Sequence, residues 1–136
     1  MIYLDNGATS FPKPAGICMA SYCGNPGRSG HMMSIRTGEE VYRARRAVAE
    51  VFNVSSPERV VFGINATGAL NQAIKGLLCE GDHAITTAME HNSVLRPLKA
   101  LEAVGVKHTI VACDPEGFVR PEAVEAAVRD ETRLIV

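Results

Sequence analysis

The sequence has no long apolar run and no marked excess of charge of either sign. A membrane-spanning helix needs about 20 apolar residues, and the start of the chain carries Asp5 where a signal peptide is apolar. Fourteen Lys and Arg against fifteen Asp and Glu give a formal net charge of -1, which supplies no broad attraction for nucleic acid or an anionic membrane. We therefore expect no membrane and no nucleic-acid partner, and a cytoplasmic location.

The sequence is not dense in cysteine, and the spacing of its cysteines is not that of a metal site. The four cysteines contain no CxxC pair and have no metal-like spacing with the histidines; they are Cys18, Cys23, Cys79 and Cys113. Repeats and low-complexity segments are also missing. We expect reduced thiols, no bound metal and one continuous piece of chain.

What the sequence does contain is an average globular composition, with 46% apolar and 21% charged residues in 136. Apolar spacing predicts helices and strands in alternation, which favours an α/β fold with a mostly parallel sheet and flanking helices. A capping box of Thr37 and Glu40 is expected to start the first helix. The expected helices cover residues 37–52, 70–81, 94–104 and a segment from Pro121, and the expected strands cover 59–64, 83–87, 106–112 and 134–136.

The last expected strand, residues 134–136, is apolar and stops without a following helix. Such a strand belongs inside a sheet. We expect residues 1–136 to be the front part of a larger protein, and the alternative is a complete domain that ends in a short edge strand.

Two polar segments follow neighbouring strands and are candidates for a ligand site. In open α/β sheets, ligands bind beyond the carboxyl ends of the strands, where helix N-termini attract anions. The first segment, NATGALN at residues 65–71, offers the N–H and hydroxyl of Thr67 to a phosphate, or else Asn65 or Thr67 only caps a helix. It is neither a GxxxxGK[ST] loop nor a GxGxxG fingerprint.

The second segment holds His91, whose ring either stacks on a planar ligand and exchanges protons or is a loop histidine satisfied by its neighbours. It follows the strand expected at residues 83–87. Equivalent positions in adjacent units place it at the same sheet edge as Thr67.

Four stretches together resemble the N-terminal region of the class V aminotransferase family, in particular its cysteine desulfurase and selenocysteine lyase branch. They are YLDNGATSFPKP, NPGRSGH, NATGALNQAIKGLL and GDHAITTAMEHNSVLRPLKAL. The resemblance implies a pyridoxal 5'-phosphate enzyme of fold type I that removes sulfur or selenium from cysteine or selenocysteine and leaves alanine. It also implies a homodimer, a small amino-acid substrate and a possible sulfur-acceptor protein.

The resemblance assigns roles residue by residue. Ala66 and Thr67 match the pair that binds the cofactor phosphate, and His91 matches the catalytic histidine that stacks on the pyridine ring. Asn65 stands where many desulfurases have glycine, a difference that affects the backbone of the loop and leaves the Thr67 match intact.

On the substrate side, Asn6, Ala8 and Thr9 match the N-terminal segment that borders the active site. Arg28 and His31 match a loop near the active site and the subunit interface.

In the family, the Schiff-base lysine, the aspartate that pairs with the pyridine nitrogen and the sulfur-accepting cysteine lie beyond the matched region. None of the four lysines here matches that lysine. The resemblance therefore implies that residues 1–136 are an N-terminal segment and the first part of the cofactor-binding large domain, without the rest of that domain or the C-terminal small domain, and are inactive alone. The alternatives are another class V aminotransferase or lyase, and a non-catalytic fragment with only a phosphate-binding loop.

Overall fold

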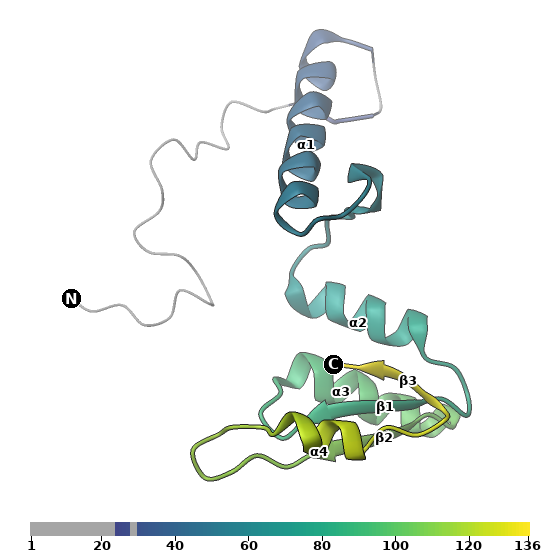
Figure 1. Ribbon diagram of the computed structural model, residues 1–136. Helices are drawn as coiled ribbons and strands as arrows, with labels where there is room; N and C mark the ends of the chain where they lie inside the picture. Colours follow the sequence, from purple (N-terminus) through teal and green to yellow (C-terminus); the bar gives the residue numbers. More distant parts are fainter. Residues whose placement is uncertain (1–23, 28–29) are drawn as a thin grey trace, which may run out of the picture. The chain divides into compact units, whose positions relative to one another are not determined.

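The computed structural model describes residues 24–27 and 30–136, and the chain divides into two compact units, residues 1–61 and 62–136. Figure 1 shows the elements along the chain. In the first unit these are α1 (Met32–Val51) and a short 3₁₀-helix (Pro57–Arg59). In the second they are α2 (Ala66–Leu77), β1 (His83–Thr87), α3 (Asn92–Leu101), a second 3₁₀-helix (Glu102–Val104), β2 (Lys107–Val111), α4 (Pro121–Ala126) and β3 (Thr132–Ile135).

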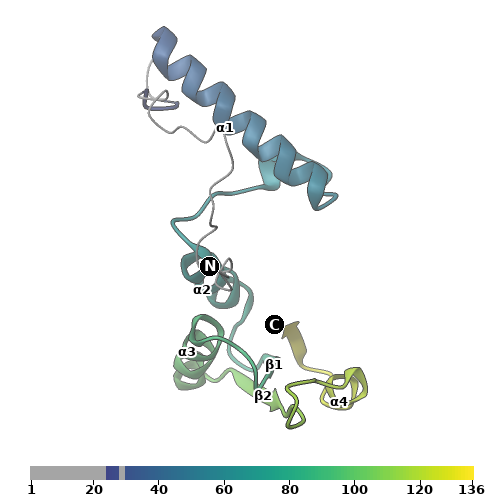
Figure 2. The ribbon, with the colours of Figure 1, turned by 90° about the vertical axis from the view of Figure 1, so that its left-hand side faces the viewer.

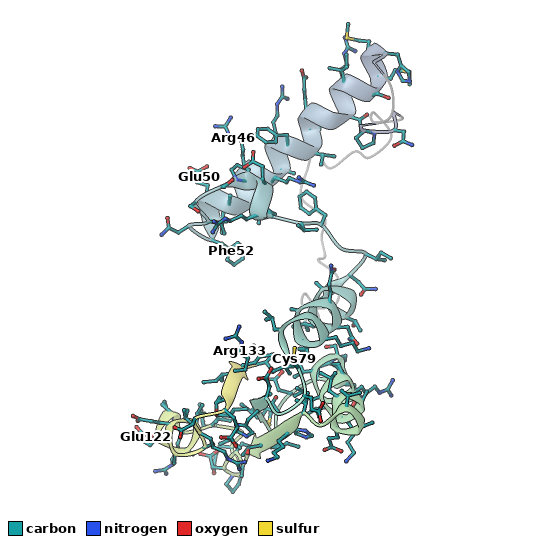
Figure 3. The ribbon with its side chains drawn as sticks, turned by 90° about the vertical axis from the view of Figure 1, so that its right-hand side faces the viewer. Arg46, Glu50, Phe52, Cys79, Glu122 and Arg133 are labelled. Carbon is teal, nitrogen blue, oxygen red and sulfur yellow. The ribbon has the colours of Figure 1, made fainter. Side chains whose placement is uncertain are left out.

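Helix α1 begins five residues before the start that the sequence predicts, and the expected capping box is wrong. His31 is the N-cap, and its Nδ1 accepts a hydrogen bond from the Ser34 N–H at 3.3 Å. Thr37 lies inside the helix, where its hydroxyl donates to the Met33 carbonyl at 2.9 Å. The helix ends before Phe52, whose side chain is exposed (Figure 3).

The strand expected over residues 59–64 does not form. Val60 has extended dihedral angles, φ -87° and ψ 111°, yet no strand is assigned between the first 3₁₀-helix and α2. The side chains of Val61 and Ile64 are 74% and 100% exposed. Because a strand needs a neighbour for its backbone hydrogen bonds, β-propensity alone does not make this segment one.

The second unit contains the parallel sheet that the sequence predicts. Its strand order is β2-β1-β3, and β1 pairs in parallel with both neighbours. The central strand β1 matches the prediction residue for residue and is buried on both faces from His83 to Thr86. The ring of His83 lies between hydroxyls of the two flanking strands, Thr109 and Thr132, at 2.8 Å from each.

Helices lie on both sides of this sheet, as the alternation of elements predicts. Figure 2 shows α3 and α4 on opposite sides of the strands. The main core lies where α2 and α3 pack together and against β1; its buried side chains are Ile74, Leu78, Ala84, Val94, Leu98 and Val106. Gly105 ends the helical segment after α3 in a left-handed conformation, with φ 85°, which glycine adopts at little cost. This packing fixes the starts of α2 and α3 relative to each other.

Candidate functional site

An open pocket of about 350 Å³ lies where α2 and α3 begin. Its lining comes from the first two turns of the two helices and the residue before α3: Thr67, Asn71, His91, Asn92, Ser93 and Arg96. Thr67 and His91, the two residues that sequence reasoning places at one sheet edge, therefore line the same pocket. The side-by-side packing of α2 and α3 (Figure 1) brings them together.

At the start of α2, one residue caps the helix and another is available to bind a ligand. Asn65 is the N-cap, and its Oδ1 accepts the Gly68 N–H at 2.8 Å. Thr67 is exposed, and no residue in the described part of the chain partners its hydroxyl or accepts the N–H groups of Ala66 and Thr67. The cap interpretation is thus correct for Asn65, while Thr67 keeps its donors available for an anion at a helix N-terminus.

His91 begins α3 in a similar way. Its Nδ1 accepts the Ser93 N–H at 3.1 Å and lies 2.9 Å from the Ser93 hydroxyl. Because a nitrogen that accepts a backbone N–H carries no proton, the neutral ring holds its proton on Nε2. His91 is exposed and lines the pocket, so its ring is within reach of a ligand there.

Sequence reasoning missed the rest of the lining. Asn71 is half-buried, and its amide nitrogen donates to the Thr67 carbonyl at 3.0 Å and to the Ser93 carbonyl at 3.4 Å. Its place four residues after Thr67, on the same helical face, was the available signal. Arg96 is the only charged residue among the described lining, so the pocket favours a negatively charged ligand.

The other expected site residues lie elsewhere or outside the described chain. Asn6, Ala8, Thr9 and Arg28 fall outside the described residues. His31 belongs to the first compact unit, where its ring caps α1. The proposed roles of these residues remain predictions.

The described cysteines and charged groups supply no second site. Cys79, which follows α2 (Figure 3), is an exposed thiol and Cys113 is a partly buried one. Among residues 24–27 and 30–136, no three His, Cys, Asp or Glu side chains gather as metal ligands. Within the same residues, no helix has the length and apolar character to cross a membrane.

Comparison with known proteins matches nearly the whole chain to one family. The family model for class V aminotransferases matches residues 2–136. The cysteine desulfurase IscS of Pseudomonas fluorescens is 36% identical over 145 aligned positions, covering 98% of this chain and 36% of the relative. The chain therefore spans about a third of the length of the curated relatives it matches.

Solved structures show the same likeness. A NifS-like protein superposes with a TM-score of 0.73 at 34% identity, covering 82% of this chain and 31% of that one. SspA, solved in complex with cysteine, also gives a TM-score of 0.73, at 28% identity, covering 86% of this chain and 34% of that one.

Proposed function

Because this chain belongs to the class V aminotransferase family, we propose that it forms the cofactor-phosphate site of a pyridoxal 5'-phosphate-dependent cysteine desulfurase. The family resemblance seen in the sequence is confirmed, and the parallel sheet with its flanking helices agrees with a fold type I domain. In this proposal residues 1–136 comprise an N-terminal segment and the first part of the cofactor-binding large domain.

One observation carries the proposal: Thr67 and His91 line a single pocket that contains no carboxylate among its described lining. The Thr67 hydroxyl and the N–H groups of Ala66 and Thr67 fit a phosphate, which helix N-termini bind through free donors and the helix dipole. The exposed ring of His91 fits a planar aromatic group on the other side of the pocket. The donors present thus suit a phosphorylated pyridine.

When bound, pyridoxal phosphate supplies an electron-withdrawing ring that stabilises negative charge on the α-carbon of an amino acid. The residues of this chain bind the cofactor and orient it. Thr67 donates its hydroxyl and N–H to the phosphate, and Arg96 adds positive charge at the pocket. His91, with Nδ1 engaged by the Ser93 N–H, stacks on the cofactor ring and holds a transferable proton on Nε2.

The proposed substrate is cysteine, with selenocysteine as its heavier analogue, and the product is alanine. The names of the relatives support this substrate, since one is a cysteine desulfurase and another was solved with cysteine. In the proposal, Asn6, Ala8, Thr9, Arg28 and His31 contribute to the substrate side. The proposal also includes a homodimer and a sulfur-acceptor protein.

Phosphate binding is tested on the 136-residue chain by NMR titration with inorganic phosphate, pyridoxal phosphate and phosphate-free pyridoxal. The amides of Ala66 and Thr67 should shift with both phosphates. Thr67→Val should weaken binding about ten- to a hundredfold, because a hydrogen bond to a charged group contributes about 1.5–3 kcal/mol.

The matched control is Thr37→Val, which removes a hydroxyl that bonds only to the Met33 carbonyl of α1. It should bind like the unmodified chain. Equal affinity of the Thr67 variant, or equal affinity for pyridoxal and its phosphate, would contradict the proposed site.

A further inference from the structure

A row of hydrogen bonds connects the two halves of the pocket. The amide nitrogen of Asn71 donates to the Thr67 carbonyl on α2 and to the Ser93 carbonyl on α3. Ser93 in turn approaches His91 Nδ1 with its N–H at 3.1 Å and its hydroxyl at 2.9 Å. The row thus runs from the residue proposed to bind phosphate to the residue proposed to stack on the ring.

The position of Asn71 explains why a polar side chain stands there. Farther along the two helices, apolar residues such as Ile74 and Leu98 pack in the core. At the helix starts, where the pocket opens, Asn71 replaces this packing with hydrogen bonds across the two helices. A half-buried amide is costly unless it is bonded, and here its nitrogen serves two carbonyl groups on different elements.

We propose that Asn71 is a positioning residue that holds the first turn of α2 in register with the His91–Ser93 cap of α3. By fixing the Ser93 backbone, it keeps the Ser93 N–H on His91 Nδ1 and the ring proton on Nε2. This inference rests on the proposed function and adds to it a residue that acts through Thr67, Ser93 and His91.

The test compares Asn71→Leu, which keeps the size of the side chain and removes its donor, with Gln72→Leu. Gln72 is the exposed neighbour on the same helix and does not line the pocket, so it undergoes the same chemical change away from the site. Inorganic phosphate titrated into the 136-residue chain should bind about three- to tenfold more weakly to the Asn71 variant, the loss expected for one net hydrogen bond. The Gln72 variant should bind normally.

A second measurement needs no ligand. When the ring is neutral, the ¹⁵N spectrum of the His91 imidazole in the unmodified chain should show the Nε2–H tautomer. In Asn71→Leu the His91 spectrum should change toward that of a mixture of the two tautomers, whereas in Gln72→Leu the spectrum should stay unchanged. A side chain that only stabilised the fold would change the melting temperature and leave this spectrum alone.

The outcomes separate the two ideas. If the unmodified chain binds no phosphate, the proposed function fails and the His91 spectrum alone decides the role of Asn71. An unchanged His91 spectrum in Asn71→Leu, or unchanged phosphate affinity where the unmodified chain binds, overturns the inference. If Asn71→Leu does not fold, Asn71→Asp replaces it, because the ionised carboxylate keeps the shape and lacks the donor; the same change of spectrum is expected.

Discussion

His83 and Arg129 are joined through both nitrogens of a fully buried imidazole. Nδ1 of His83 lies 2.8 Å from the Thr132 hydroxyl, which accepts the backbone N–H of Arg129 at 2.8 Å. Nε2 lies 2.8 Å from the Thr109 hydroxyl, which accepts the Arg129 guanidinium at 3.2 Å. One ring therefore links β1 to both neighbouring strands and to the segment before β3.

Stability should fall when the pH drops below about 6.5. Burial first, and then the charge of Arg129, lowers the pKa of His83 below its usual 6.5, with Glu131 acting in the opposite direction. Above that pH the ring is neutral in both states. Below it the unfolded chain binds the proton more readily, so the free energy of unfolding decreases until the pH reaches the folded-state pKa. Urea unfolding at several pH values measures the slope.

Two substitutions show whether His83 is the group responsible. His83→Asn should remove its share of the slope between pH 6.5 and the folded-state pKa. His31→Asn changes an exposed histidine at an N-cap, where asparagine is well suited, and should keep the slope. A slope that survives in the His83 variant would assign the pH dependence to other groups.

Loss of the cap at the start of α2 should destabilise the pocket locally. Asn65→Ala removes the acceptor of the Gly68 N–H and should cost about 1 kcal/mol. Asn65→Asp keeps an acceptor and should stay close to the unmodified chain. Hydrogen exchange of the α2 amides measures both variants, and equal protection in Asn65→Ala would show that the cap contributes nothing.

Local sequence signals predicted β1 well and failed at residues 59–64 for a physical reason. Both segments have β-propensity, but β1 is surrounded by two strands that it pairs with. Residues 59–64 would need a neighbouring strand to pair with. The tertiary fold decides whether such a neighbour is present, and local β-propensity carries no information about it. The start of α1 was missed because His31 is not among the usual capping residues.

The sequence predicts those site residues that lie at the ends of helices and strands. Thr67 and His91 both stand at helix starts, as predicted, but the strand expected before Thr67 does not form. The packing of α2 against α3, and not a shared sheet edge, brings the two residues to one pocket. Asn71 and Ser93 meet only because α2 and α3 pack against each other. Arg96 had no signal in the sequence that distinguished it from a surface cation.

The 136-residue chain should form no stable covalent adduct with pyridoxal phosphate. The described lysines lie away from the pocket: Lys75 is in the last turn of α2, Lys99 pairs with Glu102 at 2.6 Å, and Lys107 begins β2. After incubation and dialysis the chain should show no yellow Schiff-base absorbance, and with cysteine it should yield no alanine. A band that survives dialysis and disappears with one Lys→Ala change would contradict this.

The apolar segment before α2 should make the chain self-associate. Val61 and Ile64 are largely exposed, and Val60 already has extended dihedral angles. An exposed, extended apolar segment of this kind can pair with a strand of another molecule. Val128 is also an exposed apolar side chain, at 51%, but it lies just beyond α4, outside the extended segment. Sedimentation velocity should therefore show association that increases with protein concentration. Ile64→Lys should reduce this association, and Val128→Lys should leave it unchanged. Equal effects of the two variants would mean that general surface hydrophobicity, rather than strand pairing, drives the association.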